Sequence, residues 1–67
     1  MTLNDIGDRV KELRSKQNLS QKDLALICGF DKTYLSRVES GKQNITIEKL
    51  LVLCAKLNVS LKEFFDF

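Results

Sequence analysis

The chain of 67 residues has no proline and no histidine, and it has only two cysteines, Cys28 and Cys54. Zinc sites are built from about four nitrogen or sulfur donors, so these residues cannot supply a complete ligand set. The cysteines also form no Cys-x-x-Cys pattern. We therefore expect no metal and no cofactor, and we expect two reduced, buried thiols. A disulfide between them is the alternative.

The sequence also lacks the motifs that carry common catalytic chemistry. There is no nucleophile elbow, and no paired carboxylates lie in an evident cleft. The three glycines, at positions 7, 29 and 41, are too widely spaced to cradle a phosphate. These absences argue against an enzyme and favour a binding protein.

Long hydrophobic runs and an export leader are missing as well. No apolar stretch approaches the ~18 residues that a membrane span requires, and no basic-plus-apolar segment opens the chain. Hydrophobic residues nevertheless make up 43% of the sequence, which is too many for a disordered tail. We expect a single domain over residues 1–67, located in the cytoplasm and without a membrane partner.

The sequence has no large excess of charge of either sign. It contains 11 basic and 9 acidic residues, so the net charge is only +2. A balance this even neither requires nor excludes a nucleic-acid partner. DNA binding would depend on where a few Lys and Arg side chains lie, and its salt dependence would be modest.

Hydrophobic periodicity predicts an all-α domain of five helices. Ile6, Val10 and Leu13 form one apolar stripe over about 5–17, with Asn4 as the expected N-cap. Further helices are predicted over 21–28, 32–40, about 47–56 and from 61 onward. Each of these four follows a residue type that caps helix N-termini, namely Ser20, Asp31, Thr46 and Ser60.

Residues 21–40 are the most informative stretch. Leu24 and Ala25 share one face of the first short helix, and Leu35 and Val38 share one face of the second. Gly29 stands between them, where a tight turn favours positive φ. This is the apolar frame of a helix-turn-helix, which leaves the opposite face of the second helix free.

The chain resembles the Cro/phage-repressor helix-turn-helix family, also called the xenobiotic-response-element family. The residues that carry the resemblance are Leu19–Gln21, Leu24–Ala25, Gly29, Tyr34–Glu39 and Gly41, and further on Leu50, Leu57, Val59 and Phe64–Phe65. The segment DKTYLSRVESGKQNIT, residues 31–46, is most similar to controller proteins of restriction–modification systems. The resemblance implies a compact, repressor-like DNA-binding domain. We expect the helices at about 47–67 to complete its core and to form a dimer.

The free face of the 32–40 helix is predicted to read base edges in the major groove. Lys32 and Arg37 can donate to guanine O6 and N7, and the Thr33 methyl group can meet a thymine methyl. Ser36 lies on the same face. The alternative is an ordinary solvated helix face.

Phosphate contacts are predicted on both sides of that helix. Gln21 begins a helix whose free N–H groups can hold a phosphate oxygen, and the resemblance implies that this glutamine contacts DNA. Tyr34 can reach a phosphate through its hydroxyl. The loop residues Lys42, Gln43 and Asn44 can clamp the backbone without reading sequence. The alternatives are a simple helix start and a polar surface loop.

Two further groups have structural roles. The resemblance implies a partly buried ion pair between Arg14 and Glu39, where the residues alone indicate only two charges beside apolar stripes. Several apolar side chains gather near the C-terminus, and we expect Leu61, Phe65 and Phe67 to form a dimer interface. The alternative is that they only close a small core.

These observations predict a regulator of transcription that binds an inverted-repeat operator in double-stranded DNA as a homodimer. Its two recognition helices would lie about 34 Å apart. A phage-type repressor and a restriction–modification controller both fit. The rival interpretation is an antitoxin or a bridging protein-interaction module, for which Leu26 and the C-terminal phenylalanines would form the partner surface.

Overall fold

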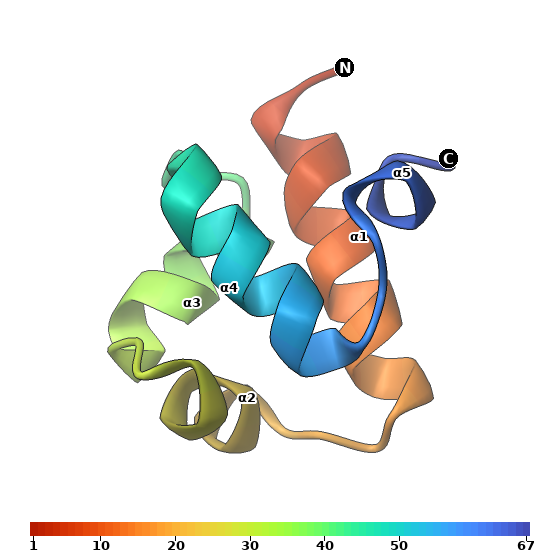
Figure 1. Ribbon diagram of the computed structural model, residues 1–67. Helices are drawn as coiled ribbons and strands as arrows, with labels where there is room; N and C mark the ends of the chain where they lie inside the picture. The colour runs from red at the N-terminus through yellow and green to blue at the C-terminus, as the bar shows by residue number, and fades with distance from the viewer.

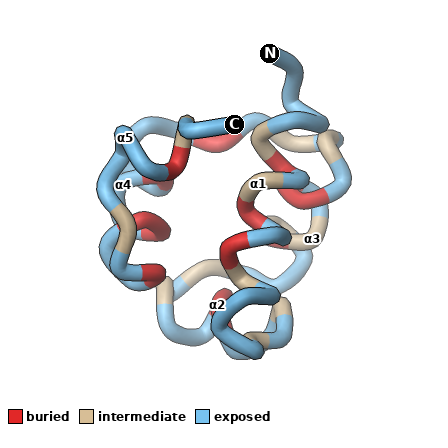
Figure 2. Tube along the Cα trace, turned by 90° about the vertical axis from the view of Figure 1, so that its right-hand side faces the viewer, coloured by how far each residue is buried: buried red, intermediate tan, exposed pale blue.

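The computed structural model describes residues 1–67 as five α-helices without a β-strand, which confirms the predicted fold class. The helices are α1 (Leu3–Lys16), α2 (Gln21–Cys28), α3 (Lys32–Glu39), α4 (Ile47–Leu57) and α5 (Leu61–Phe64). Helix α1 packs mainly against α3, and α4 packs against α2 and α5. Both chain termini lie at the top of the molecule in Figure 1. In Figure 2, turned by 90° from Figure 1, α4 and α5 lie on one side of the molecule and α1 and α3 on the other.

Local capping determines where the helices begin. Ser20, Asp31, Thr46 and Ser60 each accept a hydrogen bond from a backbone N–H of the following turn, as predicted. The expected N-cap of α1 was wrong, because Thr2 takes this role and Asn4 lies inside the first turn. Thr2 and Asp5 form a reciprocal capping box, in which the Asp5 carboxylate accepts from the Thr2 N–H at 2.9 Å. Two backbone N–H groups are satisfied in this way, whereas Asn4 would satisfy one.

The core lies between the inner faces of all five helices. Val10, Leu24, Leu35, Leu53 and Phe64 are completely buried, and each comes from a different helix. In Figure 2 the buried segments (red) face the space that the helices enclose, and the outer faces are exposed. Burying apolar side chains from every element is the main term that can hold a domain of this size together.

Two glycines have structural consequences. Gly29 adopts φ +72° and ends α2, as the sequence predicts. Gly7 is buried on α1, and a Cβ there would collide with the carbonyl oxygens of Val38 and Glu39. Gly7 therefore allows the backbones of α1 and α3 to approach closely. The sequence analysis did not assign this role to Gly7.

Both cysteines are free thiols. Cys54 is buried as expected, but Cys28 is only partly buried, because it lies at the last turn of α2. Desolvation raises the pKa of both thiols and so favours the unreactive protonated form.

None of the five helices is long and apolar enough to cross a lipid bilayer.

Candidate nucleic-acid interface

The α2–turn–α3 unit is rigidly joined at its corner. Ala25 is almost completely buried, and its carbonyl oxygen accepts from the Phe30 N–H at 2.8 Å. The Asp31 carboxylate accepts from the Thr33 N–H at 3.3 Å and caps α3. Leu35 and Val38 are buried. These contacts set the orientation of α3 and leave its opposite face in solvent.

The exposed face of α3 carries the predicted base-contacting side chains. Lys32 and Thr33 are exposed at its N-terminal end, and neither side chain has a polar partner within the protein. Arg37 is exposed at the other end, and its Nη2 donates to the carbonyl oxygen of Lys42 at 3.3 Å. Ser36 is half-buried and is the least accessible of the four. Donors are therefore most available at the start of α3.

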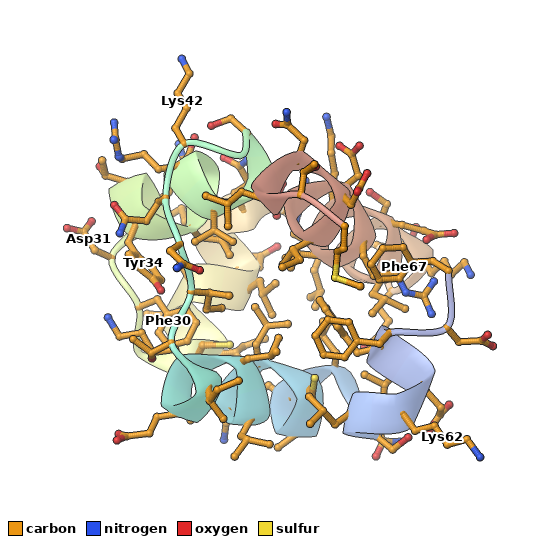
Figure 3. The ribbon with its side chains drawn as sticks, turned by 90° about the horizontal axis from the view of Figure 1, so that it is seen from above. Phe30, Asp31, Tyr34, Lys42, Lys62 and Phe67 are labelled. Carbon is orange, nitrogen blue, oxygen red and sulfur yellow. The ribbon has the colours of Figure 1, made fainter.

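The loop after α3 is held by side chains of the helix. The Tyr34 hydroxyl donates to the carbonyl oxygen of Asn44 at 3.4 Å, and Arg37 holds Lys42 at the other end of the loop. Gln43 is half-buried, whereas Lys42 and Asn44 are exposed. In Figure 3 the Lys42 side chain points away from the helices. The loop backbone is thus held in place, while the Lys42 ammonium group remains free for an anionic partner.

Tyr34 also forms an aromatic cluster that sequence analysis missed. Its ring meets the Phe30 ring edge-on, with centroids 5.7 Å apart, and the Lys49 ammonium lies 4.2 Å from the Tyr34 centroid. Both aromatic side chains point toward the start of α4 (Figure 3). Desolvation raises the pKa of the Tyr34 phenol, which keeps the hydroxyl a hydrogen-bond donor. Lys49 lies in the first turn of α4, where the helix dipole disfavours a cation. This unfavourable position is the feature of the sequence that could have indicated a contact between Lys49 and an aromatic ring.

The N-terminus of α2 presents free donors beside α3. The backbone N–H groups of Gln21 and Lys22 have no partner within the protein, because Ser20 caps the Asp23 N–H instead. Asp23 in turn accepts from the Ser20 N–H at 3.2 Å. This bond is the main cause of the lowered pKa of Asp23. The Gln21 side chain is half-buried and does not extend freely into solvent, because its Nε2 donates to Glu39.

Arg14 and Glu39 form a two-point ion pair between α1 and α3. Nε of Arg14 lies 2.8 Å from Oε2 of Glu39, and Nη2 lies 3.0 Å from Oε1. The Glu39 side chain is only 3% exposed. The third arginine nitrogen, Nη1, donates to the carbonyl oxygen of Leu19 at 2.6 Å. The pair therefore joins α1, the α1–α2 connection and α3.

The C-terminal aromatic residues divide into core and surface. Phe64 is completely buried, Phe65 is half-buried, and Leu61 and Phe67 are exposed. The Phe65 and Phe67 rings stack with centroids 6.3 Å apart. One chain thus uses Phe64 for its own core and leaves Leu61 and Phe67 on the surface. Phe67 lies on the opposite side of the molecule from Tyr34 of α3 (Figure 3).

The fold and this surface define a helix-turn-helix protein, and comparison with known proteins agrees. The family described as helix-turn-helix matches residues 10–64, and the chain belongs to it. Control protein C.MunI of Mycoplasma sp is 38% identical over 69 aligned positions, which cover 96% of this chain and 93% of that protein. These matches confirm the predicted resemblance to restriction–modification controllers.

Solved structures give the same result. The controller protein C.AhdI from Aeromonas hydrophila superimposes with a TM-score of 0.90 at 36% identity, over 94% of this chain and 96% of that one. The controller protein C.Esp1396I, solved as a tetramer in complex with its natural 35 base-pair operator, gives a TM-score of 0.87 at 33% identity. That match covers 96% of this chain and 84% of the relative.

Proposed function

We propose that this protein is a sequence-specific regulator of transcription that binds an inverted-repeat operator as a homodimer, in the manner of restriction–modification controllers. The observation that carries the proposal is the outward face of α3, where Lys32 and Thr33 have no partners and the helix is anchored by a buried opposite face. The likeness to a relative solved on its operator supports it. The activity requires no catalytic step and no cofactor, and it places the protein in the cytoplasm with its DNA.

The proposal gives different tasks to the two kinds of contact. The start of α3 enters the major groove, where Lys32 donates to guanine acceptors and Thr33 meets thymine. Arg37 and Ser36 extend this surface toward the C-terminal end of α3. The phosphate contacts come from Gln21, Tyr34 and the loop residues Lys42, Gln43 and Asn44. Phosphate contacts orient the helix, and base contacts provide specificity.

Dimerisation would place two such surfaces on successive turns of one face of the DNA, about 34 Å apart. The proposed interface consists of α5 and the adjoining part of α4. Its apolar surface includes Leu61, 38% exposed, and Phe67, 55% exposed, with Leu51 and Val52 of α4 also exposed. A small domain that leaves this much apolar surface in water gains stability by covering it with a second copy.

The proposal is tested by a binding series over single-base variants of the operator. Arg37→Ala should cost about 1–3 kcal/mol per half-site if Arg37 pairs with guanine, and it should flatten the preference at one base pair. Lys42→Ala should weaken all sequences alike and reduce the salt slope by about one per half-site.

An unchanged preference profile for Arg37→Ala would show that Arg37 does not read bases. If both variants bound operator DNA like the parent, α3 would not be the reading element. A protein-interaction role, as in an antitoxin or bridging module, would then take its place. Leu26 of α2, which is 79% exposed, is the candidate contact residue for that role.

A further inference from the structure

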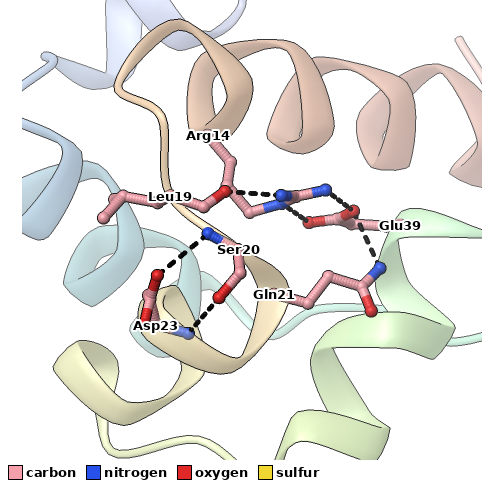
Figure 4. Close-up of polar contacts among 6 residues, drawn as sticks. All are labelled: Arg14, Leu19, Ser20, Gln21, Asp23 and Glu39. Atoms are coloured by element: carbon pink, nitrogen blue, oxygen red, sulfur yellow. Dashed lines mark hydrogen bonds and ion pairs between the residues drawn. The ribbon is translucent and has the colours of Figure 1, made fainter.

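The side chain of Gln21 is held by the buried carboxylate of Glu39. Nε2 of Gln21 donates to Oε1 of Glu39 at 3.1 Å, and the same oxygen accepts from Nη2 of Arg14 at 3.0 Å (Figure 4). Glu39 is buried and belongs to α3, whereas Gln21 is the first residue of α2. A buried residue of the recognition helix thus determines the conformation of a side chain at the start of the neighbouring helix.

The hydrogen-bonding capacity of the carboxamide shows what this arrangement leaves free. A glutamine amide has two N–H donors and one carbonyl acceptor, and only one N–H is used within the protein. The second N–H has no partner within the protein, and the backbone N–H groups of Gln21 and Lys22, in the same first turn of α2, are also unpaired. Glutamine also loses much rotamer entropy when it is ordered, so an amide ordered before DNA binding avoids that cost at the moment of contact.

The electrostatics of the contact also depend on the ion pair. An unpaired carboxylate beside the start of α2 would repel a DNA phosphate. Arg14 neutralises Glu39 through two hydrogen bonds, so Glu39 can accept from Gln21 without presenting a net negative charge to DNA. Arg14 also holds the carbonyl oxygen of Leu19, which fixes the backbone that leads into α2.

We propose that Glu39 is a positioning residue for DNA binding, acting through Gln21. It holds the Gln21 carboxamide so that its second N–H joins the two free backbone N–H groups on a single DNA phosphate. This inference rests on the proposed operator-binding function and deepens it. Because Glu39 is on α3 and Gln21 is on α2, the link also couples the base-reading helix to the phosphate contact that sets its register.

The test is a double-mutant cycle on operator affinity with Gln21→Ala and Glu39→Gln. Glutamine has nearly the same shape as glutamate, and binding is measured below the unfolding temperature of every variant. Each single substitution should weaken binding about 3- to 10-fold per half-site, the usual effect of one net hydrogen bond. The double variant should be little weaker than either single one. If the affinity loss of the double variant equalled the product of the two single losses, Glu39 would act only through the fold. That result would overturn the proposal.

Two further measurements keep the test decisive if Glu39→Gln does not fold. Gln21→Asn retains the amide but is one methylene shorter, so it cannot span Glu39 and the phosphate, and it should bind like Gln21→Ala. Parent-like binding by Gln21→Asn would overturn the proposal. Replacing the contacted phosphate by a neutral methylphosphonate should weaken the parent more than Gln21→Ala, which keeps only the two backbone N–H groups. Equal weakening of both would also overturn it.

Control variants separate this inference from the proposed function. Glu48→Gln makes the same chemical change at an exposed position of α4 and should bind like the parent. If Lys42→Ala weakens binding while the Gln21 variants do not, operator binding stands and the role of Glu39 is refuted. If the parent itself binds no operator, the proposed function fails and the inference fails with it.

Discussion

Helix α1 carries two arginines that are equally inaccessible to solvent but have different partners. The side chains of Arg9 and Arg14 are each 12% exposed. Arg14 pairs with Glu39, which is 3% exposed, and links α1 to the helix-turn-helix. Arg9 pairs with Glu12, which is 50% exposed, and also donates to the carbonyl oxygens of Phe64 at 2.8 Å and Glu63 at 2.7 Å.

The difference lies in what remains when each arginine or its partner is removed. Glu39 and Arg14 depend on each other, because water cannot replace either partner in a buried pair without a large desolvation cost. The backbone carbonyls that Arg9 holds are neutral, so the loss of Arg9 leaves no buried charge without a partner. One arginine therefore secures the helix-turn-helix half of the fold, and the other secures the C-terminal segment.

The largest effect is expected from Glu39→Ala. It leaves the Arg14 guanidinium buried and uncompensated, which typically costs about 3–5 kcal/mol of unfolding free energy, although the intact pair need not be net stabilising. Denaturant titration measures the loss, with Glu48→Ala at an exposed position as the matched control. A loss no larger than that of the control would show that the buried pair is unimportant for stability.

Arg9→Ala should have a smaller effect on stability, about 1–3 kcal/mol for the lost hydrogen bonds to the end of α5. Because the Arg9 guanidinium also lies 5.9 Å from the Phe67 centroid, the substitution should loosen the C-terminal segment selectively. Hydrogen exchange should therefore increase in α5 and remain unchanged in α3. An equal increase in both helices would break the distinction between the two arginines.

Phe67→Ala should change assembly more than stability. Phe67 is 55% exposed in a single chain, so truncating it removes little buried surface from the monomer. If α5 forms the dimer interface, the parent should sediment as a dimer at micromolar concentration, and the variant should sediment nearer the 7.7 kDa chain mass. A parent that stays monomeric up to hundreds of micromolar would refute the interface.

The smallest effect is expected from the exposed pair. A hydrogen bond from Arg9, followed by the charges of Lys16 and Arg9, lowers the pKa of Glu12 below its ordinary value of 4.5. A carboxylate whose pKa is lower in the folded state stabilises the fold above pH 4.5, and this contribution is lost as the pH falls through the folded-state pKa. Glu12→Gln should slightly flatten acid unfolding, and salt should abolish the difference from the parent. A salt-independent difference would contradict an exposed pair.

Features that depend on neighbouring residues were predictable from the sequence alone. The five helices, the caps at Ser20, Asp31, Thr46 and Ser60, and the positive φ of Gly29 follow from periodicity and from residue preferences within one turn. The Thr2 box was equally local but was overlooked in favour of Asn4. The exposed face of α3 was also predictable, because the positions of Leu35 and Val38 determine which face is buried.

Contacts between distant residues were decided only by the tertiary structure. Gln21 meets Glu39 across 18 positions, and Arg9 meets Phe64 across 55. Such contacts depend on how the helices cross and on how far each side chain reaches, and neither quantity is encoded in a periodic pattern. Gly7 shows the reason most clearly. Its sequence neighbours give no indication of its role, which exists only because the carbonyl oxygens of α3 lie against it in the folded chain.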